Sequence, residues 1–172
     1  MTVINVECDN IYSGWEVPLS EIEDKSKKIF DFLISQKEIS EKHFLNDYQY
    51  DSVFFDILFC DGAKTHEINR DYRNKDYPAD IITFAVFADS DEDERIIVDG
   101  ILNLGEIIIA LDKIEESASE KGISREVELA FFIAHGLMHL LGFDHQTEQD
   151  YNFVIEYQKK ALESINIKYD KV

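Results

Sequence analysis

The alternation of apolar and polar side chains predicts several β-strands in this chain. Residues Val3 to Cys8 alternate as a half-buried strand does. Tyr50 to Cys60 is β-branched and aromatic, and the turn-forming pair Asp61-Gly62 closes it. Later apolar segments predict two more strands and a candidate for a third: Asp80 to Phe87, Leu104 to Ile109 with Gly105 at its entry, and Ile96 to Val98.

Apolar residues three or four positions apart predict helices around these strands. Ser20 and Glu23 have capping-box spacing, which predicts the start of a helix with an inner face of Ile22, Ser26, Ile29 and Leu33. A short helix is expected over Ala63 to Arg73, after the second strand.

Three further helices are predicted in the C-terminal half. Asp112 and Glu115 repeat the capping-box spacing, and Gly122 ends the helix they open. Ser124 is a suitable N-cap for a long apolar helix that runs past His139. Thr147 can cap the last helix, whose apolar stripe is Tyr151, Val154, Ile155, Leu162 and Ile165.

This order of elements predicts an α+β, or mixed α/β, fold with helices packed on one small mixed sheet. The chain has no internal repeat, low-complexity segment or linker, so we expect residues 1–172 to form a single domain.

Composition limits the class of protein. No apolar run approaches the roughly 20 residues that span a bilayer, and the N-terminus is acidic, without the pattern of a signal peptide. Cys8 and Cys60 are too few for a disulfide framework and are interpreted as buried thiols. We therefore expect a cytoplasmic protein with no membrane partner. The net charge of −19 means that RNA binding would need a local cationic groove.

A histidine motif is the most informative chemical feature of the sequence. His135 and His139 stand four apart in an apolar helical run, so both side chains project from one helix face. Gly142 can end that helix and return His145 to the same point. Three imidazoles leave one position of a tetrahedral metal open, as in catalytic rather than structural zinc sites. The same ligands also bind nickel, cobalt or copper.

Gly136 decides between two kinds of zinc enzyme. The motif matches the metzincin pattern HExxHxxGxxH at its histidines and glycine, but Gly136 stands where a metalloprotease carries its glutamate base. With that glycine, HGLMHLLGFDH resembles the signature of the YbeY family, zinc-dependent endoribonucleases of bacterial rRNA maturation. The resemblance implies a zincin-like arrangement of helices around the sheet and one Zn²⁺ per chain. It also implies single-strand-specific cleavage in maturation of the 16S rRNA 3′ end and in ribosome quality control, with rRNA and ribosomal or ribosome-associated proteins as partners.

A second segment supports the resemblance. Ile68, Asn69, Tyr72 and Arg73 match the family's LNxxYR motif, and Asp80, Thr83 and Phe84 match a following TDVLSFP motif, with Ala85 in place of the proline. Arg73 is a candidate catalytic residue, because its planar guanidinium can hold a phosphate and offset transition-state charge. Pairing with a nearby carboxylate is its alternative role.

Two acidic residues are candidates for supporting roles. Asp144, next to the third histidine, can orient an imidazole or accept a proton, and a turn role after Gly142 is equally consistent with its position. Glu106 is either a partner of a zinc-bound histidine or a structural residue. We interpret His43 as a surface or packing histidine and leave His66 out of the metal site. The acidic run Asp89 to Glu94 is expected to be a solvated loop.

Three functions remain open from sequence alone. The first is a metal-dependent endoribonuclease acting on rRNA. Either water or the substrate's own 2′-hydroxyl would attack the phosphodiester bond. The second is a zinc metallohydrolase of a peptide or a small phosphoester, which the acidic composition favours. The third is a ribosome-associated binding protein in which zinc is structural.

Overall fold

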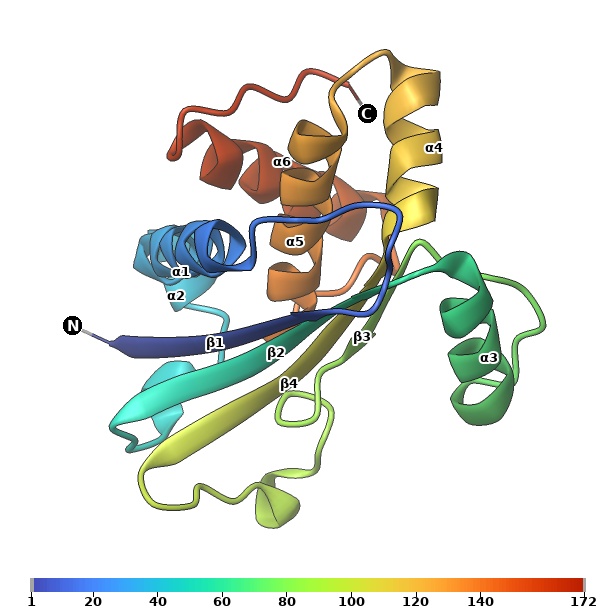
Figure 1. Cartoon of the computed structure of the whole chain (residues 1–172). Helices are drawn as coiled ribbons and strands as arrows, with labels where there is room; N and C mark the ends of the chain where they lie inside the picture. The colour runs from blue at the N-terminus through green and yellow to red at the C-terminus, as the bar shows by residue number, and fades with distance from the viewer. Residues whose placement is uncertain (1, 172) are drawn as a thin grey trace.

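The fold is built on a four-stranded mixed sheet with the strand order β1-β2-β4-β3. A computed structural model describes residues 2–171 (Figure 1). Strands β1, β2 and β4 run parallel to one another, and β3 pairs antiparallel with β4 at one edge. The strand bounds are β1 Val3–Asn10, β2 Ser52–Cys60, β3 Ile81–Phe84 and β4 Ile101–Ala110.

Helices connect the strands and complete the chain in the predicted order, so the mixed α/β fold class is confirmed. Three long helices follow the last strand. The helical bounds are α1 Leu19–Ser35, α2 Lys37–Ser40, η1 Leu45–Asp47, α3 Gly62–Tyr72, η2 Glu92–Glu94, α4 Leu111–Lys121, α5 Arg125–Leu140 and α6 Glu148–Glu163.

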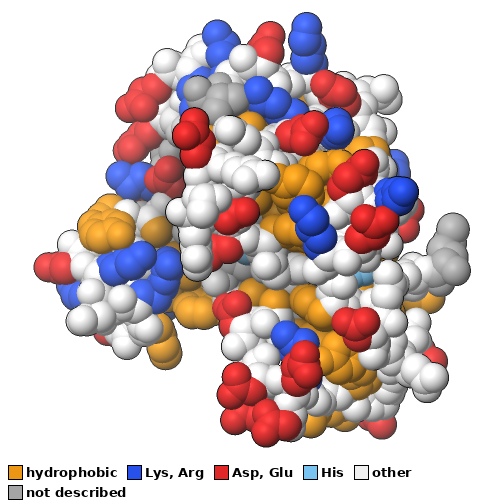
Figure 2. Space-filling view, turned by 180° about the vertical axis from the view of Figure 1, so that it is seen from behind, with side chains coloured by type: hydrophobic (Ala, Val, Ile, Leu, Met, Phe, Trp, Pro, Cys, Tyr) orange, Lys and Arg blue, Asp and Glu red, His pale blue; other side chains and the backbone are white. Residues whose placement is uncertain are grey.

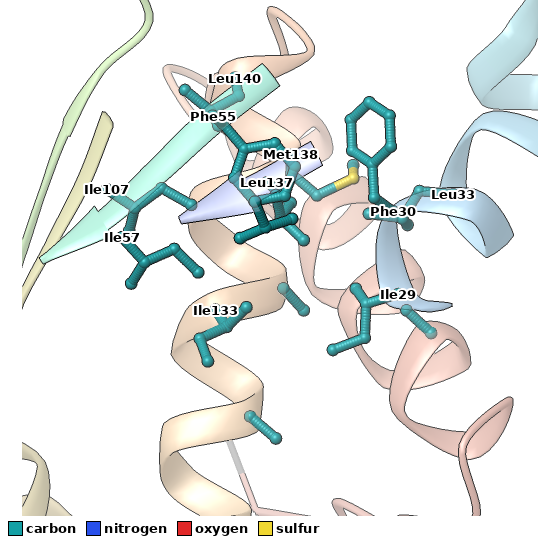
Figure 3. Close-up of a cluster of buried hydrophobic side chains, with 14 of the residues drawn as sticks. Ile29, Phe30, Leu33, Phe55, Ile57, Ile107, Ile133, Leu137, Met138 and Leu140 are labelled. Carbon is teal, nitrogen blue, oxygen red and sulfur yellow. The ribbon is translucent and has the colours of Figure 1, made fainter. Parts of the chain in front are cut away.

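The main core lies between one face of the sheet and helices α1, α5 and α6 (Figure 1). Helix α1 packs on β1, whereas α5 packs on β3 and β4 and is itself covered by α6. Figure 3 shows side chains of α1, β2, β4 and α5 meeting in this core, among them Phe30, Phe55, Ile107 and Leu137. The apolar residues of the predicted histidine helix therefore pack against the sheet and the neighbouring helices.

A smaller apolar cluster covers part of the opposite face of the sheet. Ile68 of α3 packs there with Cys60, Ile82 and Ile108. Because α3 leads from β2 towards β3, this cluster fixes the end of α3 beside the edge strand. The C-terminal end of α3 and the edge strand both contribute to the site described below.

Both predicted capping boxes are wrong, because tertiary partners take the acidic side chains. Helix α1 begins at Leu19, with Pro18 as the N-cap residue, and Glu23 Oε1 instead accepts a hydrogen bond from the backbone of Cys8 at 3.1 Å. Helix α4 begins at Leu111 without a side-chain cap. Asp112 Oδ1 accepts from the backbone of Gly62 at 2.8 Å and so ties α4 to α3.

Other predicted boundaries divide into confirmed and corrected ones. Ser124 and Thr147 cap α5 and α6 through their side chains, and Gly122 ends α4, as predicted. Asp61 is the N-cap of α3, where the sequence predicted a turn.

Two predicted strands are shorter than expected. The segment Asp80 to Phe87 pairs only over Ile81–Phe84, because Ala85 begins a turn that leaves the sheet. Ile96 to Val98 forms a single bridge between Val98 and Ile101.

Within residues 2–171, no helix is both long enough and apolar enough to cross a membrane. Both cysteines are free thiols; Cys60 is buried, and Cys8 is only partly covered. Burial raises the pKa of each thiol to about 12, so neither is a ready thiolate.

Candidate metal centre

The three histidines of the motif come together at the C-terminal end of α5. His135 and His139 lie one turn apart on the helix. Gly142 has φ +92°, a conformation that side chains disfavour, and it reverses the chain after the helix. The Phe143 N–H bonds back to the Met138 carbonyl at 3.0 Å, which closes the turn and brings His145 over the same face.

The nitrogen atoms of this cluster are spaced for one metal ion. One ligand atom from each of His135, His139 and His145 lies within 4.8 Å of the others. The Nε2 atoms of His135 and His139 are 3.0 Å apart, close to the roughly 3.3 Å between two nitrogens on a tetrahedral zinc with Zn–N bonds of about 2.0–2.1 Å. The donor set thus fits a zinc ion with an open position.

Burial keeps the two helical histidines in the neutral form that binds metal. The pKa of His135 is lowered from its usual value, first by burial and further by the nearby His145. Burial also lowers the pKa of His139, to about 4, with the neighbouring His135 and His145 adding to the shift. Neutral imidazoles need not release a proton before they coordinate a cation.

The three histidines line a pocket of about 410 Å³ that is also lined by Arg73. Arg73 is the C-cap residue of α3, which packs on the face of the sheet opposite to α5. It therefore reaches the pocket from the other side of the edge strand. Figure 2 shows α3 as a projecting lobe with Lys and Arg side chains on its surface. The pocket combines residues from five segments: Arg73, Ile81, Thr83, Ala85, Asp89, His135, His139, Gly142, Phe143, Asp144 and His145.

Asn69 holds Arg73 and the loop after it, a role that the motif match did not specify. The side chain of Asn69 is fully buried. Its Nδ2 donates to the Tyr77 carbonyl at 2.9 Å, and its Oδ1 accepts from the Arg73 guanidinium at 3.3 Å. Its backbone carbonyl accepts from the N–H groups of Arg73 and Lys75. Asn69 therefore holds both the guanidinium of Arg73 and the loop that runs from Arg73 to Tyr77.

Asp144 lies at the pocket, where it organises the turn that carries His145. Its Oδ1 accepts from the backbone N–H of His145 at 2.8 Å, and its Oδ2 accepts from Gln146 Nε2 at 3.0 Å. The hydrogen bond from the His145 backbone is the main cause that lowers the Asp144 pKa. Asp144 is thus a stable carboxylate, with both oxygens already bonded.

Glu106 does not lie in this pocket, within the part of the chain that the structure describes. It faces Asp56 across β2 and β4, and its pKa is raised first by burial and then by Asp56. The partner of a metal-site histidine comes instead from α6, where Gln158 Oε1 lies 3.0 Å from His135 Nδ1. Periodicity had given no reason to single out Gln158.

Three other residues complete the comparison with the sequence. Asp89, from the run expected to be solvated, lines the pocket. His66 lies outside it and pairs with Asp76 at 2.8 Å. His43 is buried in packing, as one of its two interpretations held, and its Nδ1 accepts from the Leu45 backbone at 3.1 Å.

Gly136 is pressed against the sheet. A Cβ atom at this position would lie 2.8 Å from two side-chain carbons of Ile107 on β4. Ile107 is fully buried. A glutamate here would therefore start its side chain inside the core, so this backbone does not accommodate the protease base at that position.

Three comparisons with known proteins agree with this geometry. The family model described as endoribonuclease YbeY matches residues 8–166. An endoribonuclease YbeY of Bacillus cereus (strain B4264) is 38% identical over 133 residues, 76% of this chain and 85% of the relative. One from Bacillus thuringiensis (strain Al Hakam) is 39% identical over 118 residues, 68% of this chain and 76% of the relative. The solution structure of TM1509 from Thermotoga maritima has TM-score 0.52 and 21% identity, covering 96% of this chain and 92% of that one.

The fold and the site define a mixed α/β protein with three histidines and an arginine in one pocket. The family match and the relatives resolve which such protein it is. The chain belongs to the YbeY family of endoribonucleases.

Proposed function

We propose that this protein cleaves single-stranded RNA with a Zn²⁺ ion held by His135, His139 and His145, and that its substrate is rRNA. The observation that carries the proposal is the shared pocket of these histidines and Arg73, which presents a metal site and a phosphate-binding cation to one substrate. Gly136 also argues against peptidase chemistry, because it supplies no glutamate base and a larger side chain there would press on Ile107.

The chain's own residues account for substrate binding and orientation. When bound, zinc supplies a Lewis acid for the reacting water or phosphate. Arg73 holds the scissile phosphate through two N–H groups and offsets the charge that builds up on it. Asn69 aims the guanidinium, and Asp144 holds the His145 turn. The two bonds of Asp144 favour this positioning role over proton transfer.

Local charge and exposed aromatic rings reconcile an acidic protein with RNA. Within residues 2–171, Arg73 and Lys75 have no ion-pair partner, so their charge is available at the α3 side of the pocket. Tyr72 and Tyr77 are 76% and 53% exposed. Exposed aromatic rings stack on unpaired bases, which are accessible in single strands and not in duplexes.

The decisive experiment compares Arg73 variants on a short RNA with the sequence of the 16S rRNA 3′ end. We expect Arg73→Ala to reduce the cleavage rate by about 100-fold, the usual loss when a charge-stabilising donor is removed. Arg73→Lys restores only part of the rate, because a lysine lacks the planar fork. The matched control is Arg70→Ala, an exposed arginine of the same helix that does not line the pocket. His139→Ala, purified identically, reports any contaminating nuclease.

Parallel assays separate the remaining functions. A chelator should abolish RNA cleavage and zinc should restore it, whereas casein and simple phosphodiesters should stay intact. A product with a 2′,3′-cyclic phosphate identifies the 2′-hydroxyl as the nucleophile. Turnover of casein without RNA cleavage would refute the nuclease proposal. A folded His135→Ala protein that retains cellular function would show that zinc is structural.

We also propose that the protein works in the cytoplasm, with ribosomal or ribosome-associated proteins as partners in rRNA maturation and ribosome quality control.

A further inference from the structure

Gln158 is a fully buried polar residue in the middle of α6, and both ends of its side-chain amide are engaged. One end lies 3.0 Å from Nδ1 of His135. The other lies 3.2 Å from the backbone carbonyl of Phe131, one turn before His135 on α5. The amide thus bridges two points on the metal-site helix from a neighbouring helix.

The Phe131 carbonyl decides how this amide is oriented. A carbonyl oxygen only accepts hydrogen bonds, so the Gln158 nitrogen must face it and donate. The amide oxygen then faces His135, and an oxygen that only accepts requires a proton on Nδ1. The opposite tautomer would place two acceptors against each other and leave the fully buried amide oxygen of Gln158 without a hydrogen bond.

A proton on Nδ1 leaves the lone pair of His135 on Nε2. His135 Nε2 lies 3.0 Å from Nε2 of His139, on the side of the ring that faces the other two histidines. We propose that Gln158 is a positioning residue that selects the metal-binding tautomer of His135 and fixes its ring before the metal arrives. This inference rests on the metal site of the proposed function, but it concerns the metal-free protein and does not depend on the substrate.

The first test is the tautomer itself, measured in metal-free protein by long-range ¹H–¹⁵N correlation spectra of the histidine rings. We expect His135 to carry its proton on Nδ1 in the wild type. A wild-type His135 protonated on Nε2 would overturn the inference without any variant being made.

The second test uses substitutions that separate the acceptor from packing. Gln158→Met keeps a side chain of similar length but has no oxygen, so we expect a mixture of His135 tautomers and a zinc affinity lower by about 10–100-fold, the usual effect of losing such a partner. Gln158→Glu keeps the acceptor that faces His135 but loses the donor to the Phe131 carbonyl. We therefore expect it to lower stability while it retains the Nδ1 proton and most of the zinc affinity. Zinc affinity is measured by competition with a chromophoric chelator.

The matched control is Gln149→Met, an exposed glutamine in the first turn of the same helix. It should leave tautomer and affinity unchanged. A folded Gln158→Met protein with wild-type tautomer and zinc affinity within twofold would contradict the inference. If the wild type binds zinc through the expected tautomer but cleaves no RNA, the proposed function fails while the role of Gln158 stands.

Discussion

Gly136 faces Ile107 with no room for a Cβ atom between them, at the point where the helix of His135 and His139 packs on the central sheet. A Cβ at residue 136 would come within 2.8 Å of both Cγ2 and Cδ1 of Ile107, closer than real Cβ atoms approach. The contact sets the height of α5 above β4. Since α5 carries two of the three clustered histidines, the same contact sets where their side chains lie relative to the sheet.

We expect Gly136→Ala to reduce the free energy of unfolding by up to about 2 kcal/mol, because the overpacking cost of about 1–3 kcal/mol is offset only in part by the gain in helix propensity of about 1 kcal/mol. Urea denaturation measures this. Gly62→Ala is the control, since its Cβ would meet chiefly the flexible end of Lys113. In a double-mutant cycle, Ile107→Ala should make Gly136→Ala harmless; additive losses would show that the contact is not the cause.

Asn69→Ala tests whether Arg73 depends on its buried neighbour. The substitution leaves the Tyr77 carbonyl and one side of the guanidinium unbonded, so we expect a stability loss of about 1–3 kcal/mol and an RNA cleavage rate lower by about tenfold. The double variant with Arg73→Ala should be no slower than Arg73→Ala alone, because both changes act through the same guanidinium. Independent rate losses would place Asn69 outside that pathway.

The ion pair between Glu128 and Lys121 anchors the start of α5. Glu128 is fully buried, and its carboxylate lies 2.9 Å from Lys121 Nζ. It also accepts from Ser117 Oγ at 2.6 Å and from Tyr169 Oη at 2.8 Å, joining α4 and the C-terminal segment. We expect Glu128→Gln to destabilise the protein by about 2–3 kcal/mol, less than a fully buried pair because Lys121 is partly exposed.

Glu126→Gln is the matched control for this change. Glu126 is exposed and pairs with Arg125 at 3.6 Å, so its loss should cost below about 0.5 kcal/mol. Equal effects of the two substitutions would mean that burial of Glu128 adds nothing to stability.

His43 gives the protein a defined sensitivity to acid. Its pKa is lowered, first by burial, although a hydrogen bond with its own backbone and the charge of Asp47 act in the opposite direction. The unfolded chain therefore takes up a proton here below a pH of about 6.5, while the folded chain resists it. The stabilising contribution is complete above that pH and is lost as the pH falls towards the folded pKa.

We expect His43→Asn to lose less stability than the wild type between pH values of about 7.5 and 5.5, because asparagine can accept the Leu45 N–H without titrating. Chemical denaturation at both pH values, with chelator present, measures the difference. An unchanged difference would show that other groups cause the acid sensitivity.

The sequence predicted that His135, His139 and His145 come together because their relation is local. Two histidines one helical turn apart and a glycine that reverses the chain are fixed by backbone geometry, whatever surrounds them. Gln158 and Asn69 could not be identified in this way. Gln158 reaches His135 from another helix, 23 residues away. Asn69 matched a motif, but its bonds depend on how the loop to Tyr77 folds back.

The failed capping boxes have the same physical origin. Glu23 and Asp112 have the right spacing for local caps, but each forms a bond with a distant backbone N–H, of Cys8 and Gly62 respectively. Local spacing identifies what a side chain is able to bond. Only the packed fold determines which of the competing partners it meets.

The unequal burial of the three imidazoles has a consequence for metal exchange. His135 and His139 are partly buried on a packed helix, whereas His145 is exposed on a turn held by Asp144. We expect an incoming ion to meet the two helical nitrogens first and the turn to close over it afterwards. Departure then requires only that turn to open, so the lifetime of the loaded protein should follow the local motion of residues 142–146 and not the unfolding of the core.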